Sequence, residues 1–195
     1  MSTETAAPAP EATNPDLPAN PTFWNYVGYW FPHLVAFGYA LVILAAISTQ
    51  FIGTDMPCPL CVLQRMAMML IGIAAIWMVG QARKGMLTLA AYARSYGLMI
   101  VAAMLGATMS TRQIELHILP GDAGYGDAVL GLHLYTWALI TFIVVIAYSA
   151  IMLMFFKPTL PVAPSGNAAL WISRILVWAF IIIIIANVVL IFAEE

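Results

Sequence analysis

Five stretches of this chain are each long and apolar enough to cross a lipid bilayer, and no other feature constrains the fold as strongly. A spanning helix needs about 20 mostly apolar residues. The candidate spans are residues 30–52, 58–80, 95–114, 130–156 and 168–192. Only 8% of the residues are charged, against about a quarter in soluble domains. The sequence therefore predicts an all-α integral membrane protein.

The charges of the short connecting segments predict its orientation, because Lys and Arg concentrate in cytoplasmic loops. The segments 81–94 and 157–167 carry basic residues: Arg83, Lys84, Arg94 and Lys157. The segments 53–57 and 115–129 carry acidic residues: Asp55, Glu115, Asp122 and Asp127. We therefore expect a multi-pass membrane protein with a cytoplasmic N-terminus. If the source is a bacterium, the membrane is the inner membrane, and Cys58 and Cys61 face the periplasm.

The two ends of the chain differ in character. Residues 1–22 are rich in Pro and contain no Lys, Arg or apolar core, which predicts a flexible cytoplasmic tail rather than a cleavable signal peptide. A four-helix membrane domain is expected over 23–156, a cytoplasmic loop over 157–167 and an additional helix over 168–195. That last helix has no polar face, so we expect a true span, which places Glu194 and Glu195 outside. The net charge of −2 excludes a basic surface for nucleic acid.

The stretch "MPCPLCVLQR" from Met56 contains the chain's two cysteines, three positions apart. Pro57 and Pro59 flank Cys58, and proline is favoured where a helix begins, so the pair is expected in the first turn. The partial positive charge of a helix N-terminus favours a thiolate there. At about 100° per residue, Cys58, Cys61 and Arg65 share one face of the helix.

Arg65 carries a permanent positive charge inside a predicted span, which makes it a functional candidate. Other interpretations of the three residues remain open. The cysteines could be small packing residues or a structural disulfide, although so short a loop gains little from closure. Arg65 could pair with a carbonyl group. Two thiols fall short of the four ligands that zinc prefers, so no metal site is predicted.

These residues resemble a known family, the disulfide bond formation protein B (DsbB) family. "CPLCVLQR" is similar to the family's C-x-x-C-x-x-x-R signature, and "LGLHLYTWAL" from Leu130 is similar to the segment with which the family enters its fourth helix. "RQIELHILP" at the end of the third span is a weaker match. Together the matches cover about residues 30–156.

The resemblance implies a four-helix bundle that reoxidises a periplasmic thioredoxin-like partner of the DsbA type and passes the electrons to ubiquinone or menaquinone. Cys58 and Cys61 would then be the catalytic redox pair, with Cys61 as the thiolate that meets the quinone. Arg65 would bind a quinone oxygen. Gln113 stands where relatives often have a quinone-facing His, and His117, one turn further on, could substitute; His117 could equally be a loop residue at the headgroup level.

The sequence departs from the family pattern in two places. The loop "ELHILPGDAGYGDAVLG" lacks the second cysteine pair that relays electrons from the partner. The fifth span and the Pro-rich tail are also additions, and the added helix suggests docking with another membrane subunit. Two alternatives therefore accompany the enzyme: a non-catalytic accessory subunit of a larger membrane complex, and a thiol enzyme similar to vitamin K epoxide reductase. His33 and His133 are not expected to form a haem site.

Overall fold

The computed structural model describes residues 14–18, 20–52, 58–119, 121, 124 and 128–193. The helices are α1 (Phe23–Ile52), α2 (Pro59–Arg83), α3 (Leu89–Leu116), α4 (Leu134–Met154), α5 (Phe156–Thr159) and α6 (Asn167–Ala193). All except α5 are long and apolar enough to cross a membrane. The predicted all-α membrane fold with five spans is therefore confirmed. The acidic residues Asp55, Asp122, Asp127, Glu194 and Glu195 lie outside the described residues.

The helix bounds differ from the apolar stretches mainly at their starts. α1 begins at Phe23 and α3 at Leu89, earlier than the predicted 30 and 95, because a helix can continue past its apolar core as long as its backbone is hydrogen-bonded. At the start of α3, the Thr88 side chain accepts a hydrogen bond from the Ala91 amide at 3.1 Å. The single-turn helix α5 was not predicted. A turn this short leaves no periodic pattern in the sequence.

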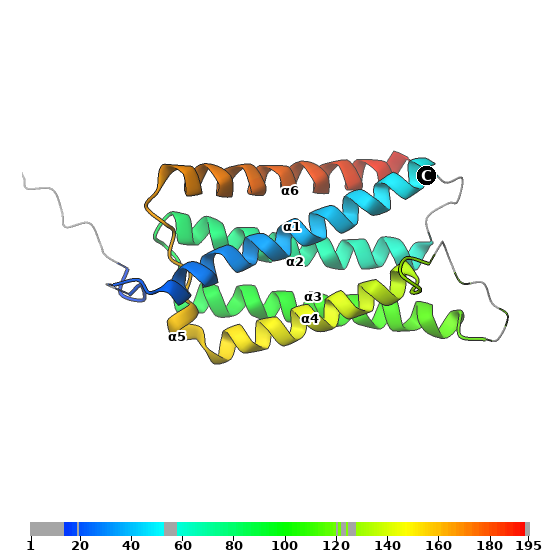
Figure 1. Cartoon of the computed structure of the whole chain (residues 1–195), viewed down its shortest axis with the longest axis horizontal. Helices are drawn as coiled ribbons and strands as arrows, with labels where there is room; N and C mark the ends of the chain where they lie inside the picture. Colours follow the sequence, from blue (N-terminus) through cyan, green and yellow to red (C-terminus); the bar gives the residue numbers. More distant parts are fainter. Residues whose placement is uncertain are drawn as a thin grey trace, which may run out of the picture.

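The five long helices lie side by side and alternate in direction (Figure 1). One end of the bundle, here called the thiol end, contains the start of α2 with Cys58, the start of α4 and the ends of α1, α3 and α6. The opposite end contains the α2–α3 connection, α5 and the start of α6. The two basic segments of the sequence therefore lie together, away from the cysteines.

α2 lies at the centre of the bundle and α6 at its edge. Half of the α2 span is buried, compared with 17% of the α6 span. α3 and α4 pack closely where the Phe142 ring lies against Gly106, at a place where an added Cβ would overlap the ring. Ala102 and Ser110, which with Gly106 form a strip of small residues at every fourth position of α3, are also buried. These small residues therefore serve ordinary helix packing.

α6 packs against α1 and α2, and three of its buried side chains make specific contacts. Ser173 binds the Nε2 atom of His33 in α1 at 2.8 Å, and the ring of Phe180 lies against Gly72 of α2. The third contact, from Asn187, belongs to the site described below. These contacts attach the added helix to the other four within a single chain.

Residues at the end of the Pro-rich segment attach to the opposite end of the bundle. Asn14 donates hydrogen bonds to the carbonyl oxygens of Gly85 and Leu87 at 3.2 and 2.9 Å. The Asp16 carboxylate accepts a hydrogen bond from the Leu89 amide at 3.1 Å, which satisfies a donor in the first turn of α3. The last part of the expected flexible tail therefore contacts the α2–α3 connection.

Candidate functional site

The two cysteines lie where α2 begins. Cys58 is the N-cap residue and Pro59 the first helical residue, a position that proline tolerates because the first amides have no acceptor within the helix. The Cys61 amide donates to the Cys58 carbonyl oxygen at 2.9 Å. The predicted placement in the first turn is therefore confirmed, while Pro57 lies outside the described residues. Both side chains are half-buried, unbridged thiols.

Cys61 faces a buried amide pair. The Nε2 atom of Gln113 in α3 donates to the Cys61 sulfur at 3.3 Å, and its Oε1 atom accepts from Gln64 Nε2 at 2.7 Å. Gln113 is completely buried and Gln64 nearly so. Because Gln64 holds the oxygen of the Gln113 amide, the N–H group is left to face the sulfur, where it can bind a thiol or a thiolate.

Arg65 lies one helical turn further into the bundle and faces α6. The residue is 5% exposed, and its Nη1 atom donates to Asn187 Oδ1 at 3.3 Å. The amide nitrogen of Asn187 donates in turn to the Met69 sulfur at 3.6 Å. Neighbouring positions on one face of α2 are thus tied to two different helices, Cys61 to α3 and Arg65 to α6.

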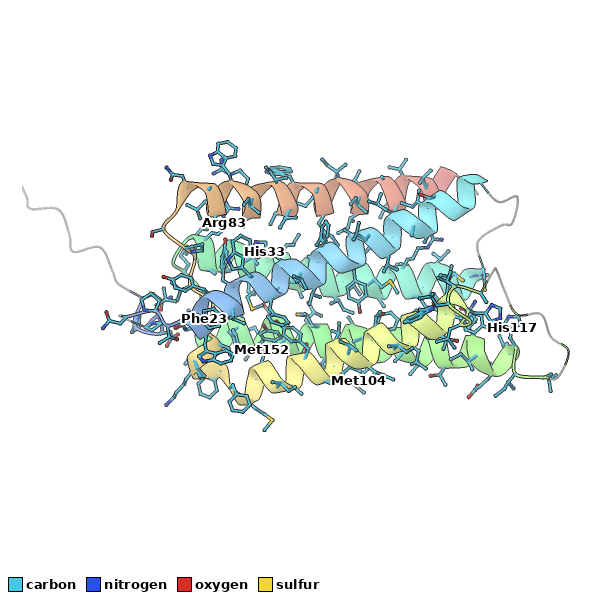
Figure 2. All side chains as sticks on the ribbon, in the orientation of Figure 1. Phe23, His33, Arg83, Met104, His117 and Met152 are labelled. Atoms are coloured by element: carbon cyan, nitrogen blue, oxygen red, sulfur yellow. The ribbon has the colours of Figure 1, made fainter. Side chains whose placement is uncertain are left out.

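His117 ends α3 and lies in a stack of rings at the thiol end (Figure 2). Its ring is nearly parallel to that of Tyr135 in α4, with ring centroids 5.9 Å apart. His133 stacks on Tyr135 as well, with a centroid distance of 5.2 Å. Gln113 is therefore the residue brought to Cys61, whereas His117 lies a turn further along α3 and packs against Tyr135.

His33 lies toward the opposite end of the bundle (Figure 2). Its Nδ1 atom binds the Tyr29 carbonyl oxygen at 2.9 Å, so this nitrogen carries the proton and Nε2 accepts from the Ser173 hydroxyl. Nδ1 is therefore used within α1, and Nε2 holds α1 to α6. This histidine contributes to packing and is remote from His117 and His133.

Sequence reasoning missed Asn187 and Gln64. Asn187 is a single amide within the apolar run "IIIIIANVVLIF", and a polar residue inside a span is a functional candidate by default. That signal was present, but its partner could not be inferred, because helical periodicity does not show which helix lies alongside. Gln64 precedes Arg65 and shares no motif with Cys61 or Gln113.

The arrangement has the groups that thiol–disulfide chemistry requires. Two adjacent thiols at a helix N-terminus can form a disulfide with each other or exchange with one supplied by another protein. Gln113 and Arg65 add buried hydrogen-bond donors beside the thiol pair. A guanidinium offers only donors, so it suits a ligand with carbonyl or anionic oxygens.

Comparison with known proteins agrees with this chemistry. The family model described as disulfide bond formation protein DsbB matches residues 29–125, which include Cys58, Cys61, Arg65 and Gln113. A curated relative from Chromobacterium violaceum, named disulfide bond formation protein B, is 37% identical over 89 residues, which are 46% of this chain. The chain spans about half the length of that relative, 51%. No solved structure matches the chain significantly.

Proposed function

Because the chain belongs to the disulfide bond formation protein B family, we propose that it is a quinone-linked thiol oxidoreductase that reoxidises a thioredoxin-like partner through Cys58 and Cys61. The observation that carries the proposal is the shared face of α2. On it, an unbridged thiol pair at the helix start lies one turn from a buried guanidinium. A packing role for the cysteines would not require that cation.

The donors around the pair fit a quinone, whose two ring oxygens are acceptors. Arg65 is the proposed anchor for one of these oxygens, because its guanidinium can bind an oxygen that gains negative charge. A bound ubiquinone or menaquinone would supply the oxidant, taking up two electrons and two protons while the two thiols become one disulfide.

The two cysteines have different proposed roles. Cys61 contacts the buried Gln113 amide and is the sulfur on the quinone side. Cys58 lies ahead of the helix at the end of the bundle and is the sulfur that exchanges with the partner. One thiol of the reduced partner attacks the Cys58–Cys61 disulfide and forms a mixed disulfide with Cys58. The partner's second thiol then attacks this mixed disulfide, so that the partner leaves with its own disulfide closed. Both protein thiols are thereby regenerated.

One cysteine pair has to accept electrons directly from the partner, because the loop before α4 contains no cysteine. The partner is proposed to be a DsbA-like protein with an accessible dithiol.

The alternative function, a non-catalytic accessory subunit, was suggested by the missing cysteine pair and the added helix. The contacts of α6 with His33, Gly72 and Arg65 give that helix a role within this chain, and they favour the enzyme.

The distribution of basic residues supports a cytoplasmic opposite end and a periplasmic thiol end. Five of the chain's seven basic residues lie in or near the opposite end, namely Arg83, Lys84, Arg94, Lys157 and Arg174. Of the other two, Arg65 is buried and Arg112 at the thiol end is paired with Glu115 at 3.4 Å. Such an asymmetry supports the proposal that the basic end is cytoplasmic, because Lys and Arg are enriched in cytoplasmic loops.

Thiol labelling in intact cells tests this orientation. After mild reduction, a maleimide too large to cross the inner membrane should label Cys58 in cells with a permeabilised outer envelope. A cysteine introduced at Lys84 should remain unlabelled until the inner membrane is lysed. The reverse pattern would contradict the orientation, and with it a periplasmic partner.

The redox function is tested on the purified full chain. The protein is reduced with dithiothreitol, freed of reductant and mixed with a short-chain ubiquinone without air. We expect two protein thiols to disappear for each quinol that forms, measured by thiol titration and by quinone absorbance. Protein whose thiols have been blocked with N-ethylmaleimide should form no quinol. Quinol formation without thiol loss, or unchanged thiols and quinone, would defeat the proposal.

A further inference from the structure

α6 reaches the bundle interior along a single narrow stripe. Ser173, Phe180 and Asn187 are each at most 1% exposed and recur every seven residues, a spacing that keeps side chains on one side of a helix. Their counterparts on the far side of α6 are more than half exposed: Ile175, Ile182 and Val189. Of these three side chains, only Asn187 reaches the redox face of α2, the face that carries Cys58, Cys61 and Arg65.

The Asn187 amide has one orientation available. A guanidinium is a donor only, so the amide oxygen must face Arg65, as it does at 3.3 Å. The nitrogen then faces the Met69 sulfur at 3.6 Å, a weak acceptor one turn beyond Arg65 on α2. Asn187 thus bridges two successive turns of α2, and both of its amide groups are used.

This contact helps to fix where the guanidinium lies. Arginine has a long side chain with many rotamers, and it loses that freedom only where partners hold it. Cys61 is held from α3 by Gln113, while Arg65 is held from α6 by Asn187. The two functional groups of the face are therefore oriented by different helices. The one that orients Arg65 is the helix added to the four-helix pattern.

We infer that Asn187 is a positioning residue, which holds the Arg65 guanidinium in the orientation that binds the quinone oxygen. The inference rests on the proposed function. The added helix is then part of the redox site rather than an attachment to it. Losing a hydrogen bond to a charged group weakens quinone binding about tenfold, while exchange of the thiols with a partner is unaffected.

The test compares Asn187→Leu, which removes the acceptor at similar volume, with Ser173→Ala, which breaks the other polar contact of the stripe far from Arg65. Each variant is made in the full chain, with and without Arg65→Met. The dissociation constant for a short-chain ubiquinone is measured by tryptophan fluorescence quenching, and its KM with dithiothreitol as reductant. N187L should raise both about tenfold, with the KM for dithiothreitol unchanged. S173A should stay within twofold of the unmodified chain.

The Arg65→Met background separates positioning from a purely structural role. If Asn187 acts through Arg65, N187L has no further effect on the dissociation constant there, because effects that share a group are not additive. A structural role predicts the same tenfold loss in both backgrounds. N187L matching S173A would also overturn the inference. Asn187→Ala covers a misfolded N187L: it removes the acceptor for Arg65 without adding bulk, so weakened quinone binding is expected and unchanged binding contradicts the inference.

Quinone binding and reduction by the unmodified chain distinguish a failure of this inference from a failure of the proposed function. If that chain neither binds nor reduces quinone, the proposed function fails and takes the positioning role with it. If it binds and reduces quinone but N187L does so equally well, only the positioning role fails.

Discussion

Cys61→Ser abolishes quinone reduction by dithiothreitol. Serine keeps the size of the side chain and can accept the hydrogen bond that Gln113 donates to Cys61, so the fold and the surroundings persist. It cannot form a disulfide with Cys58, so the electron pair has no route to the oxidant. We expect a loss of at least about a thousandfold, the scale seen when a nucleophile is removed. The rate of quinol formation by purified protein measures it.

Ser110→Ala is the matched control for this variant. Ser110 lies three residues before Gln113 in the same helix, and its hydroxyl is buried without a hydrogen-bond partner among the described residues. Its removal should therefore leave turnover and thermal stability unchanged. An unaffected rate of quinol formation in Cys61→Ser would rule out the proposed enzyme. The accessory-subunit alternative would then be tested by purifying the intact membrane complex.

Arg65→Met lowers the rate of quinone reduction about 100- to 1000-fold, the scale of removing one donor that stabilises developing negative charge. Methionine is unbranched and adapts to irregular spaces, so the helix should still pack. The substitution leaves the Asn187 oxygen without the guanidinium it now accepts from, which costs about 1–3 kcal/mol of folding free energy. Turnover and thermal unfolding in detergent measure the two effects separately.

Arg94→Met is the control for charge. Arg94 is an exposed basic residue of α3 near the opposite end, so its loss removes the same charge far from the cysteines. It should change turnover less than twofold. Adding Asn187→Leu to Arg65→Met should restore part of the lost stability, because the unpaired amide oxygen is then gone. Equal turnover in the Arg65 and Arg94 variants would show that Arg65 has no part in the reaction.

The redox face was partly predictable from local spacing. Two prolines around Cys58 indicated a helix start, and the angular spacing of Cys61 and Arg65 placed them on one face. Both arguments involve residues within two helical turns, where backbone geometry alone relates the side chains. Gln113 was named through a family resemblance, and the structure brings it to Cys61 across 52 residues of sequence. His117, offered as its substitute, stacks on Tyr135 instead.

What the sequence determined by itself is the membrane fold, its five spans, the segregation of basic residues toward one end and the thiol pair at a helix start. Each of these follows from hydrophobic length, charge or neighbouring residues. Only the tertiary structure decided that Asn187 meets Arg65, that Gln64 orients Gln113 and that His33 serves packing. The spanning helices are apolar over most of their length, so their sequences do not specify which neighbour each polar side chain faces. That choice depends on how the helices pack.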